Sequence, residues 1–553
     1  MSVTDTEHTY DVVVVGTGAA AFGAAITAAD AGLSVVMLES SELWGGSSSM
    51  SGGGVWLPNN PLMQRAGAGD SREEGLQYLE HTIGDAGPAT SRARKEAFVE
   101  GVPGIVQLLE RKGLRFVRAA DYPDYYPEAP GGKVGRAIEI DPFNVRRIGD
   151  WWKTSRGRKE GIPAPVKTDD FWLLQRAWST PGGFARGVQV AGRVAGMAVR
   201  GQWRVGMGAG LTAGLMHVAL GLRIPVWLSS PMEEILVEGD RVVGVRVARG
   251  GQTHVVRATR GVVLAGGGFD HNEDLRQKYQ GVDGTWSNGA ASNVGTPIMA
   301  AEKIGAALDL MDEAWWGGSV PPAGPGLKAG FMVSERSAPY SLIVDAAGDR
   351  FANESESYVD LGHHMFEHGK DVPGRFWMIA DRRHARRYLR SYALDPRVSK
   401  KFRETGILHH ADTVAELAGK IGIEPQRLTG TVNRFNGFAR TGIDHDFTRG
   451  SSAYDRYYGD PHVRPNPNLG PVQKGPFTAV EVVPGDLGTK GGVVTDEHAR
   501  ALRADGSVIA GLYSAGNNSA SVMGRTYPGP GSTLGPALVF GHLAAKHLAA
   551  GEG

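Results

Sequence analysis

The sequence of 553 residues contains no cysteine. Disulfide bridges, cysteine-ligated zinc, iron–sulfur clusters and thiol catalysis are therefore excluded. It also lacks an excess of either charge, because 59 basic residues balance 59 acidic ones, and this argues against a nucleic-acid partner. No run of about 18 apolar residues is free of charge, and the N-terminus MSVTDTEHTY does not resemble a signal peptide. We therefore expect a cytoplasmic protein.

Motifs for metal binding and serine hydrolysis are missing as well. The 16 histidines show no H-E-x-x-H spacing, and the adjacent pairs His363-His364 and His409-His410 point to different sides of a helix or strand. No G-x-S-x-G elbow occurs, so a serine hydrolase is not supported. We expect no metal site.

One segment departs from the balanced charge of the whole. Between Trp151 and Gly210 there are ten basic residues, three acidic ones and five tryptophans. The composition favours a solvated insertion, about residues 151–225, packed on the protein. A basic, tryptophan-bearing segment can also rest on an anionic bilayer surface. Peripheral membrane contact is therefore kept as the alternative.

Glycine is abundant, with 80 residues, about twice the usual share of roughly 7%. Residues 10–15 read YDVVVV, a β-branched run typical of a parallel strand buried on both faces. The next six residues, GTGAAA, match the G-x-G-x-x-A form of the dinucleotide fingerprint, whose glycines allow a tight turn and close approach to a pyrophosphate. A helix over about 20–31, a strand over 34–38 and a terminal acid for ribose hydroxyls follow in order. The expected nucleotide contacts are Gly16, Gly18, Ala19, Ala20 and Glu39.

Two further glycine-rich stretches favour FAD over NAD. Residues 43–49, LWGGSSS, suit a loop that wraps a larger cofactor. Far downstream, residues 507–517 read as a strand running into a glycine turn, and the last helix begins after PGPGS, at about residue 533. The N-terminus of that helix can stabilise a flavin carbonyl or a substrate oxyanion. The expected contacts from both stretches are Gly45, Gly46, Ser47, Gly516, Asn517 and Leu534.

The order of these patterns predicts an α/β protein with a discontinuous, Rossmann-like FAD-binding domain. Residues 233–268 read as a β-meander that returns to the sheet. From about residue 318 the pattern is mixed, and we expect an inserted α+β catalytic cap domain. Its expected strands lie near 342–344, 350–351 and 375–379, and its expected helices cover 413–421 and 425–440. The predicted division is 1–317 and 486–553 for the FAD-binding domain and 318–485 for the cap.

Together these motifs resemble the flavin-dependent 3-ketosteroid Δ1-dehydrogenases, within the wider fumarate reductase-like flavoprotein group. The resemblance covers most of the chain and rests on GTGAAA with Glu39, the Gly-Gly-Ser loop, GGGFD at 266–270, GDLGTKGG at 485–492 and SAGNNSASVMGRTYPGPGSTLG at 514–535. It implies removal of hydrogens from C1 and C2 of a 3-ketosteroid in steroid degradation. It also implies hydride transfer to FAD and an external electron acceptor such as a quinone. Noncovalent FAD is expected, because cysteine attachment is impossible and no motif supports histidine attachment.

The resemblance implies roles for four residues. Tyr527 and the backbone N–H of Gly531, both in YPGPG, correspond to the groups that hold the C3 carbonyl oxygen. Tyr358, in RFANESESY, corresponds to the base that takes the C2 proton. Tyr125, in YPDYY, corresponds to the tyrosine that supports this base, with Tyr126 as the adjacent alternative. Two donors would stabilise an enolate. A phenol has an ordinary pKa of about 10, so a tyrosine base needs a second phenol or the positive field at a helix end to favour its phenolate form.

Other functions stay open at this point. A 3-oxo-5α-steroid 4-dehydrogenase would apply the same chemistry at C4 and C5. A fumarate reductase-like enzyme would need arginine and histidine to hold a dicarboxylate; Arg525 lies near the right block, but the chain has no His-Pro-Thr motif. A flavoprotein with structural FAD and a lipid-binding role is the third alternative. Steroid preference and oligomeric state are not encoded in any motif that we recognise.

Overall fold

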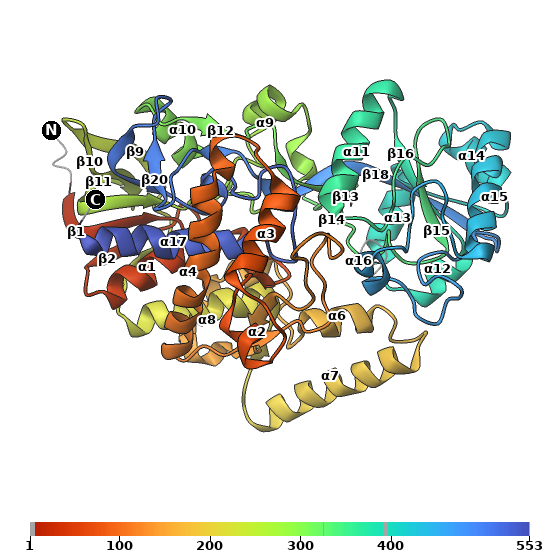
Figure 1. Ribbon diagram of the computed structural model, residues 1–553, viewed down its shortest axis with the longest axis horizontal. Coiled ribbons are helices and arrows are strands. Elements are labelled where there is room, and N and C mark those ends of the chain that lie inside the picture. The colour runs from red at the N-terminus through yellow and green to blue at the C-terminus, as the bar shows by residue number, and fades with distance from the viewer. Residues whose placement is uncertain (1–5, 325, 391–395, 552–553) are drawn as a thin grey trace.

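The computed structural model describes residues 6–324, 326–390 and 396–551. Two sheets lie next to each other along the long axis of the molecule (Figure 1), and helices cover both. The sheet near the N-terminus carries the glycine fingerprint, and the other is built from strands between Ala314 and Thr489. Both chain ends lie at the first sheet, so the first and last segments build one unit.

The nucleotide-binding sheet contains eight strands among the described residues. Its strands are β1 (Thr6–Val15), β2 (Val35–Leu38), β8 (Val226–Trp227), β9 (Met232–Glu238), β10 (Arg241–Arg249), β11 (Gln252–Leu264), β20 (Arg500–Leu502) and β21 (Val508–Ser514). Strand β1 runs parallel to β2 on one side and β11 on the other, and its last four residues, VVVV, are buried. The β-branched run therefore forms the centre of the sheet, as predicted, because both of its faces are covered. The predicted meander over 233–268 is confirmed as β9, β10 and β11.

Helices from opposite ends of the sequence pack against this sheet. Helix α1 (Ala19–Asp30) lies directly against α17 (Leu534–Ala550). Contact is close because α17 carries Gly541, where a Cβ atom would lie 2.2 Å from the carbonyl oxygen of Ala20. Helices α4 (Arg92–Arg111) and α8 (Met207–Gly221) complete this layer. The predicted first and last helices are both confirmed.

The cap sheet consists of β13 (Ala314–Val320), β14 (Gly330–Phe331), β15 (Ser341–Val344), β16 (Phe376–Ala380), β17 (Leu408–Ala411) and β18 (Phe477–Thr489). Helices α11 (Tyr358–Asp371), α14 (Val414–Ile421) and α15 (Pro425–Thr441) flank it, so the two predicted helices are confirmed. The predicted strand at 350–351 is wrong. The Arg350 guanidinium bonds to Glu354 and Asp444, and this polar pairing places the segment in a loop.

The two sheets are connected through a pair of antiparallel strands, β13 and β18. Both expected domain boundaries, after residues 317 and 485, fall inside these strands. The division into FAD-binding and cap domains stays a prediction. The remaining helices are α2 (Pro61–Arg65), α3 (Arg72–Ile83), α5 (Arg156–Lys159), α6 (Thr168–Leu174), α7 (Pro181–Val199), α9 (Glu273–Gln280), α10 (Thr296–Lys303), α12 (Arg382–Arg387), α13 (Pro396–Glu404) and α16 (Ala453–Tyr457). The remaining strands are β3 (Val55–Trp56), β4 (Phe116–Arg118), β5 (Ala137–Ile140), β6 (Phe143–Asn144), β7 (Arg204–Val205), β12 (Leu308–Asp309) and β19 (Gly492–Val493).

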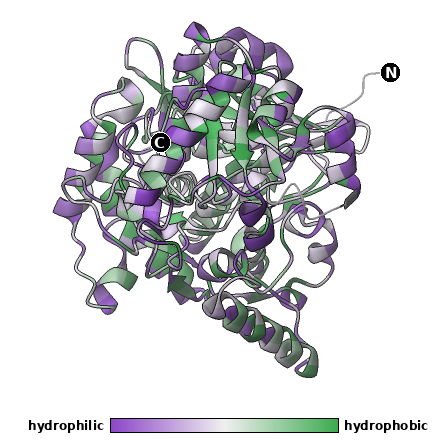
Figure 2. Ribbon diagram, turned by 90° about the vertical axis from the view of Figure 1, so that its right-hand side faces the viewer, coloured by the Kyte–Doolittle hydropathy of each residue, from purple (hydrophilic) through white to green (hydrophobic). Residues whose placement is uncertain are grey.

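The basic segment at 151–225 has two different parts. Helix α8 is buried against α1 and belongs to the core of the nucleotide-binding unit. Helix α7 instead stands away from the body (Figure 1), and Figure 2 shows hydrophobic residues along it. Within the ranges that the structure describes, no helix has the length and apolar character needed to cross a membrane.

Candidate active site

One cavity of about 820 Å³ extends from the glycine fingerprint to a cluster of tyrosines between the two sheets. Its walls include the start of α1, the loop after β2, the turn after β21, the start of α17 and the start of α11. Fourteen of the fifteen predicted site residues line it, and twelve of these are Gly16, Gly18, Ala19, Ala20, Glu39, Gly46, Ser47, Gly516, Asn517, Leu534, Gly531 and Tyr527. Tyr125 and Tyr358 also line it, whereas Gly45 is buried but does not.

The fingerprint glycines have the geometry that a cofactor phosphate needs. Gly16 has a φ of +114°, and a Cβ atom there would lie 2.3 Å from the carbonyl oxygen of Ala265. Gly18 begins α1 without a side-chain cap, so the helix N-terminus faces the cavity with its backbone N–H groups. One of these, the N–H of Ala19, donates to the Ser48 hydroxyl at 3.0 Å. Such a helix end stabilises a pyrophosphate.

The carboxylate of Glu39 stands at the end of β2, where a ribose would lie. It accepts hydrogen bonds from the Thr17 hydroxyl and, at 3.0 Å, from the backbone N–H of Ser41. Burial raises the pKa of Glu39, and these hydrogen bonds act in the opposite direction. A buried, oriented carboxylate of this kind can accept hydrogen bonds from ribose hydroxyls.

The loop after β2 is fixed against a second wall of the cavity. The Ser47 hydroxyl accepts hydrogen bonds from the backbone N–H of Ala290 and the side-chain amide of Asn293, both at 2.9 Å. Gly45 and Gly46 have φ values of +105° and +51°, which permit the turn that brings Ser47 there. A downstream segment therefore holds the wrapping loop through hydrogen bonds to the Ser47 hydroxyl.

The far end of the cradle comes from the last forty residues. Gly516, with a φ of +68°, and Asn517 follow β21, and the Asn517 side-chain oxygen accepts a bond from Trp315 at 3.2 Å. Thr533 and Leu534 form the start of α17 and line the same cavity. With the fingerprint, the acid and the loop, these residues form a continuous cradle that fits an extended dinucleotide cofactor.

Three predicted catalytic tyrosines meet at the other end of the cavity. The rings of Tyr358 and Tyr527 lie 4.7 Å apart between centroids, and Tyr125 stacks on Tyr527 at 5.1 Å. Tyr125 and Tyr358 meet edge to face at 5.4 Å. All three side chains are buried. The structure thus brings together residues that lie more than 160 positions apart, and Tyr126 instead donates to Asp360 at 3.0 Å, away from the cluster.

Tyr527 is surrounded by donors. Burial raises its pKa, while hydrogen bonds with Tyr358, Thr533 and the backbone N–H of Gly531 lower it. The Gly531 N–H can point this way because its φ is +98° and a Cβ atom would lie 2.1 Å from the carbonyl oxygen of Gly54. A substrate carbonyl at this point would meet one phenol O–H and one backbone N–H, an arrangement suited to developing negative charge.

The pKa values of the Tyr358 and Tyr125 hydroxyls are raised more strongly than that of Tyr527. Burial raises the pKa of both well above the ordinary value, so both are protonated at neutral pH in this arrangement. A hydrogen bond with Tyr125 acts in the opposite direction on Tyr358. Tyr125 is thus placed to stabilise a Tyr358 phenolate when a proton is transferred to or from it.

The structure adds tyrosines that the motifs did not single out. Tyr122, Tyr457 and Tyr458 line the cavity. The Tyr122 hydroxyl contacts those of Tyr458 and, at 3.3 Å, Tyr125. One signal was available, because residues 122–126 and 454–458 share the pattern Y-x-x-Y-Y.

The described residues contain no group of three or more His, Asp or Glu side chains arranged to hold a metal ion. His363, from one of the adjacent pairs, contacts the Glu313 carboxylate at 3.0 Å. The Glu313 carboxylate also binds Arg525 at 2.5 Å, so these polar residues pair with each other outside the cavity lining.

Comparison with known proteins identifies the family. Residues 11–534 match the family model described as an FAD binding domain. The chain is 46% identical to the 3-oxosteroid 1-dehydrogenase of Mycobacterium tuberculosis (strain ATCC 25618 / H37Rv), over 98% of this chain and 99% of that protein. The chain belongs to the flavin-dependent 3-oxosteroid 1-dehydrogenase family. FAD is accordingly its cofactor, and the predicted family is confirmed.

Two further proteins are similar to the chain over nearly its full length. The 3-ketosteroid Δ1-dehydrogenase of Sterolibacterium denitrificans, crystallised in complex with 1,4-androstadiene-3,17-dione, superimposes with a TM-score of 0.90 at 37% identity, covering 98% of this chain and 99% of that one. The 4-oxocyclohexanecarboxylate 2-dehydrogenase of Sinomonas cyclohexanicum is 36% identical over 98% of this chain and 93% of that protein. The predicted FAD-binding α/β fold is confirmed, and the roles of individual residues stay predictions.

Proposed function

We propose that this enzyme dehydrogenates 3-ketosteroids between C1 and C2. One observation carries the proposal: the Tyr527 hydroxyl, the Gly531 N–H and the Tyr358 hydroxyl meet at one point of a cavity that continues into the FAD cradle. The 3-oxosteroid 1-dehydrogenase that is 46% identical to this chain supports the substrate class.

In the proposed reaction the ketone oxygen lies between Tyr527 and Gly531. Tyr358 acts after it has lost its own proton to solvent. The C2–H bond then breaks, its proton passes to the phenolate oxygen of Tyr358, and the electron pair moves onto the ketone oxygen as an enolate. The two donors at that oxygen stabilise the charge, each by about 3–4 kcal/mol when well placed and dry. Tyr125 supports the phenolate form of Tyr358 through their hydrogen bond. When bound, FAD supplies a hydride acceptor for the C1 hydrogen.

The composition of the cavity wall argues against a fumarate reductase-like activity. Among the described residues that line the cavity, the one cationic side chain is Lys328, and it is paired with Glu160 at 2.6 Å. Arg525, the arginine suggested by the sequence, binds Asp312 and Glu313 instead. A dicarboxylate would need unpaired cations at the reacting centre, whereas the tyrosine-lined end suits an apolar ketone.

The test is anaerobic mixing of the FAD-loaded enzyme with androst-4-ene-3,17-dione. We expect loss of the visible flavin absorbance without NAD(P)H and formation of the 1,4-diene, identified by mass spectrometry and NMR. A 5α-reduced steroid that yields a 4-ene instead would establish the 4-dehydrogenase alternative. 4-Oxocyclohexanecarboxylate serves as the small-ketone control. Steroid binding without any flavin reduction would leave FAD with a structural role and refute the proposal.

We also propose that α7 rests on an anionic membrane surface. All of α7 is described, and Gly183 is its one buried residue. Phe184, Val188 and Val199 follow at helical spacing and are 66%, 58% and 90% exposed. Such an exposed apolar face, flanked by cations, suits a helix lying in a bilayer interface.

Charge around α7 supports an anionic partner. The sequence has no acidic residue between Asp170 and Glu233, whereas several arginines lie in that interval. Arg186 and Arg193 bind Asp170 from one side of α7. These ion pairs fix the polar side of the helix to the protein and leave its apolar side exposed to solvent. The preceding helix, α6, contributes Thr168 and Trp172 to the cavity wall. A lipophilic steroid, and a quinone as the proposed electron acceptor, would thus meet the protein near its site.

Vesicle co-sedimentation tests this contact. We expect binding to vesicles that contain phosphatidylglycerol, weaker binding to pure phosphatidylcholine, and loss of binding in Phe184→Glu and Val188→Glu. Ile443→Glu in the cap is a matched control, because Ile443 is as exposed as Val188, at 58% each. Equal binding by all variants would refute the role of α7. Reoxidation of the reduced enzyme by a naphthoquinone, faster than by dioxygen, is the expected result for the acceptor.

A further inference from the structure

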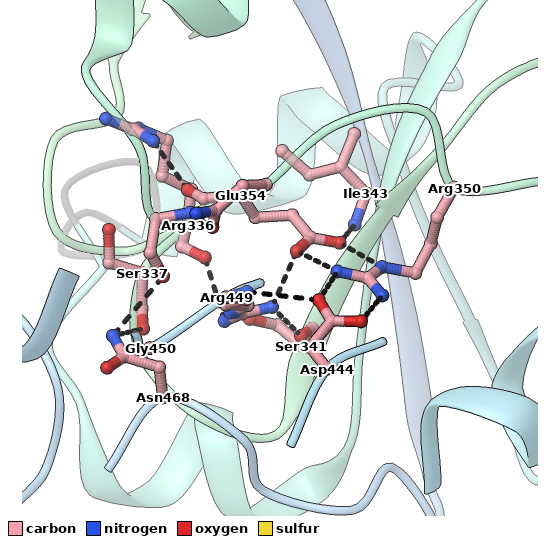
Figure 3. A network of polar contacts seen from close by, with 12 residues as sticks. Arg336, Ser337, Ser341, Ile343, Arg350, Glu354, Asp444, Arg449, Gly450 and Asn468 are labelled. Carbon is pink, nitrogen blue, oxygen red and sulfur yellow. Dashed lines mark hydrogen bonds and ion pairs between the residues drawn. The ribbon is translucent and has the colours of Figure 1, made fainter. Parts of the chain in front are cut away.

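The segment that leads into the proposed base is held by a buried arginine. Tyr358 is the first residue of α11, and residues 353–357 connect it to the preceding loop. The Arg336 guanidinium donates to the carbonyl oxygens of Glu354 at 2.5 Å and Glu356 at 2.7 Å. A third bond reaches the Met332 carbonyl at 3.2 Å. Figure 3 shows Arg336 beside Glu354 in this network.

Arg336 is itself held rigidly. Arg449 donates to the carbonyl oxygens of Arg336 and Ala338, at 3.2 and 3.0 Å, and to the Glu354 carboxylate at 3.1 Å. Arg350 binds the same carboxylate through two bonds of 2.8 Å (Figure 3). Glu354 is thus bound through both its carbonyl and its carboxylate. The turn before Tyr358 therefore has one arrangement enforced from several directions.

The same loop reaches the substrate side of the cavity. Phe331 packs edge to face on Tyr358 with ring centroids 5.2 Å apart, and Val333 and Ser334 line the cavity. Arg336 follows two residues later and is fully buried. A shift of Arg336 would therefore move both the backbone before Tyr358 and the wall that contacts its ring.

Charge adds a second effect of Arg336 on the tyrosine cluster. Burial raises the pKa of Tyr454 and Tyr458, whereas the positive charge of Arg336 lowers both. The Tyr454 ring packs against that of Tyr125, with centroids 4.3 Å apart, and Tyr125 in turn contacts Tyr358. The other charged groups facing this region are Glu335, Glu356, Asp455 and Arg449. The described hydrogen bonds of the Arg336 guanidinium all go to carbonyl oxygens. These bonds do not pair its positive charge with a carboxylate.

We propose that Arg336 is a positioning residue for proton abstraction: it fixes the Tyr358 hydroxyl against C2 of the substrate. The inference rests on the proposed role of Tyr358. It does not require Arg336 to touch substrate or FAD, and Arg336 is not among the residues that line the cavity.

Arg336→Lys and Arg336→Gln test this role. Displacement of a catalytic group by about 1 Å can cost about 10²-fold in rate, so we expect flavin reduction by steroid to slow by about 10- to 100-fold in both variants. FAD content and KM should stay close to wild type, because the cradle is unaltered. The isotope effect on flavin reduction with a 2,2-dideuterated steroid should increase. The acid limb of the kcat profile should move to higher pH in Arg336→Gln more than in Arg336→Lys, which retains the charge.

Arg94→Lys is the matched control. Arg94 is also buried and also donates to carbonyls of two separate segments, at Ala89 and Ala520, but it lies outside the tyrosine cluster. It should lose comparable thermal stability while keeping kcat and the isotope effect. If the Arg336 variants behave like this control, the positioning role is wrong. If Tyr358→Phe retains full activity, the assignment of the base fails instead, and the two failures are distinguishable.

Discussion

Replacing Tyr527 by phenylalanine separates catalysis from packing at the ketone-binding end of the cavity. The ring is enclosed by Tyr125, Tyr358 and Trp315, with centroid distances of 5.1, 4.7 and 5.1 Å. Phenylalanine keeps these contacts and removes only the hydroxyl. Loss of one oxyanion donor costs about 2.7–4 kcal/mol in the transition state, and each 1.36 kcal/mol is about tenfold in rate. The rate of flavin reduction should therefore fall by about 10²- to 10³-fold.

Stability should change much less than rate. The lost hydroxyl takes part in hydrogen bonds with Thr533 and Gly531, and the net contribution of such a bond is about 1 kcal/mol. In a chain of this size the unfolding midpoint should fall by no more than about 2 °C. Anaerobic stopped-flow absorbance measures the reduction rate, and thermal unfolding with FAD quantification measures integrity. A variant with full FAD content that reduces within about tenfold of the wild-type rate would refute oxyanion stabilisation by Tyr527.

Three further predictions concern the base and the nucleotide-binding unit. Tyr358→Phe should bind steroid but lose both flavin reduction and deuterium exchange at C2, observed by NMR; exchange at the wild-type rate would place the base elsewhere. Gly541→Ala should separate α17 from α1, because its Cβ would lie 2.2 Å from the Ala20 carbonyl oxygen, and the purified protein should contain less FAD. Burial lowers the pKa of His542 to about 4, below its ordinary value of about 6.5. The unfolded chain then binds more protons between these values, so this stability is complete above about pH 6.5 and is lost toward pH 4. Urea unfolding should show a smaller pH dependence in His542→Gln; an unchanged dependence would exclude this histidine as a source.

The nucleotide-binding half could be predicted from sequence because its determinants are local. Within forty consecutive residues lie a β-branched strand, two glycines, an alanine-rich helix and a terminal acid. Each of these determines a local backbone conformation or a cofactor contact without help from the rest of the chain. Turn residues at short intervals likewise placed the meander of β9, β10 and β11. Such patterns depend on periodicity and turn chemistry, which survive without knowledge of the tertiary fold.

The sequence-based predictions were wrong or incomplete where the structure of a segment depends on residues far away in the sequence. Arg350 and Phe351 look strand-forming, but Arg350 is bound by Asp444, which is 94 positions away. Helix α8 lies in a segment whose average composition is basic, yet its own residues are apolar and buried against α1. Tyr457 and Tyr458 reach the cavity only because α16 packs beside the chain near Tyr122. No local pattern encodes these encounters.

The pairing of α1 with α17 has a consequence for how the enzyme is made. Thr27 and His542, which share a 2.8 Å hydrogen bond across this interface, are 515 positions apart. At about 5–20 residues per second, a ribosome needs roughly 25 to 100 s to travel that distance. Throughout that interval the alanine-rich helix α1 of the nascent chain is not yet covered by α17, and its exposed apolar surface must not aggregate. Flavin capture is consequently a late event in the life of each new polypeptide.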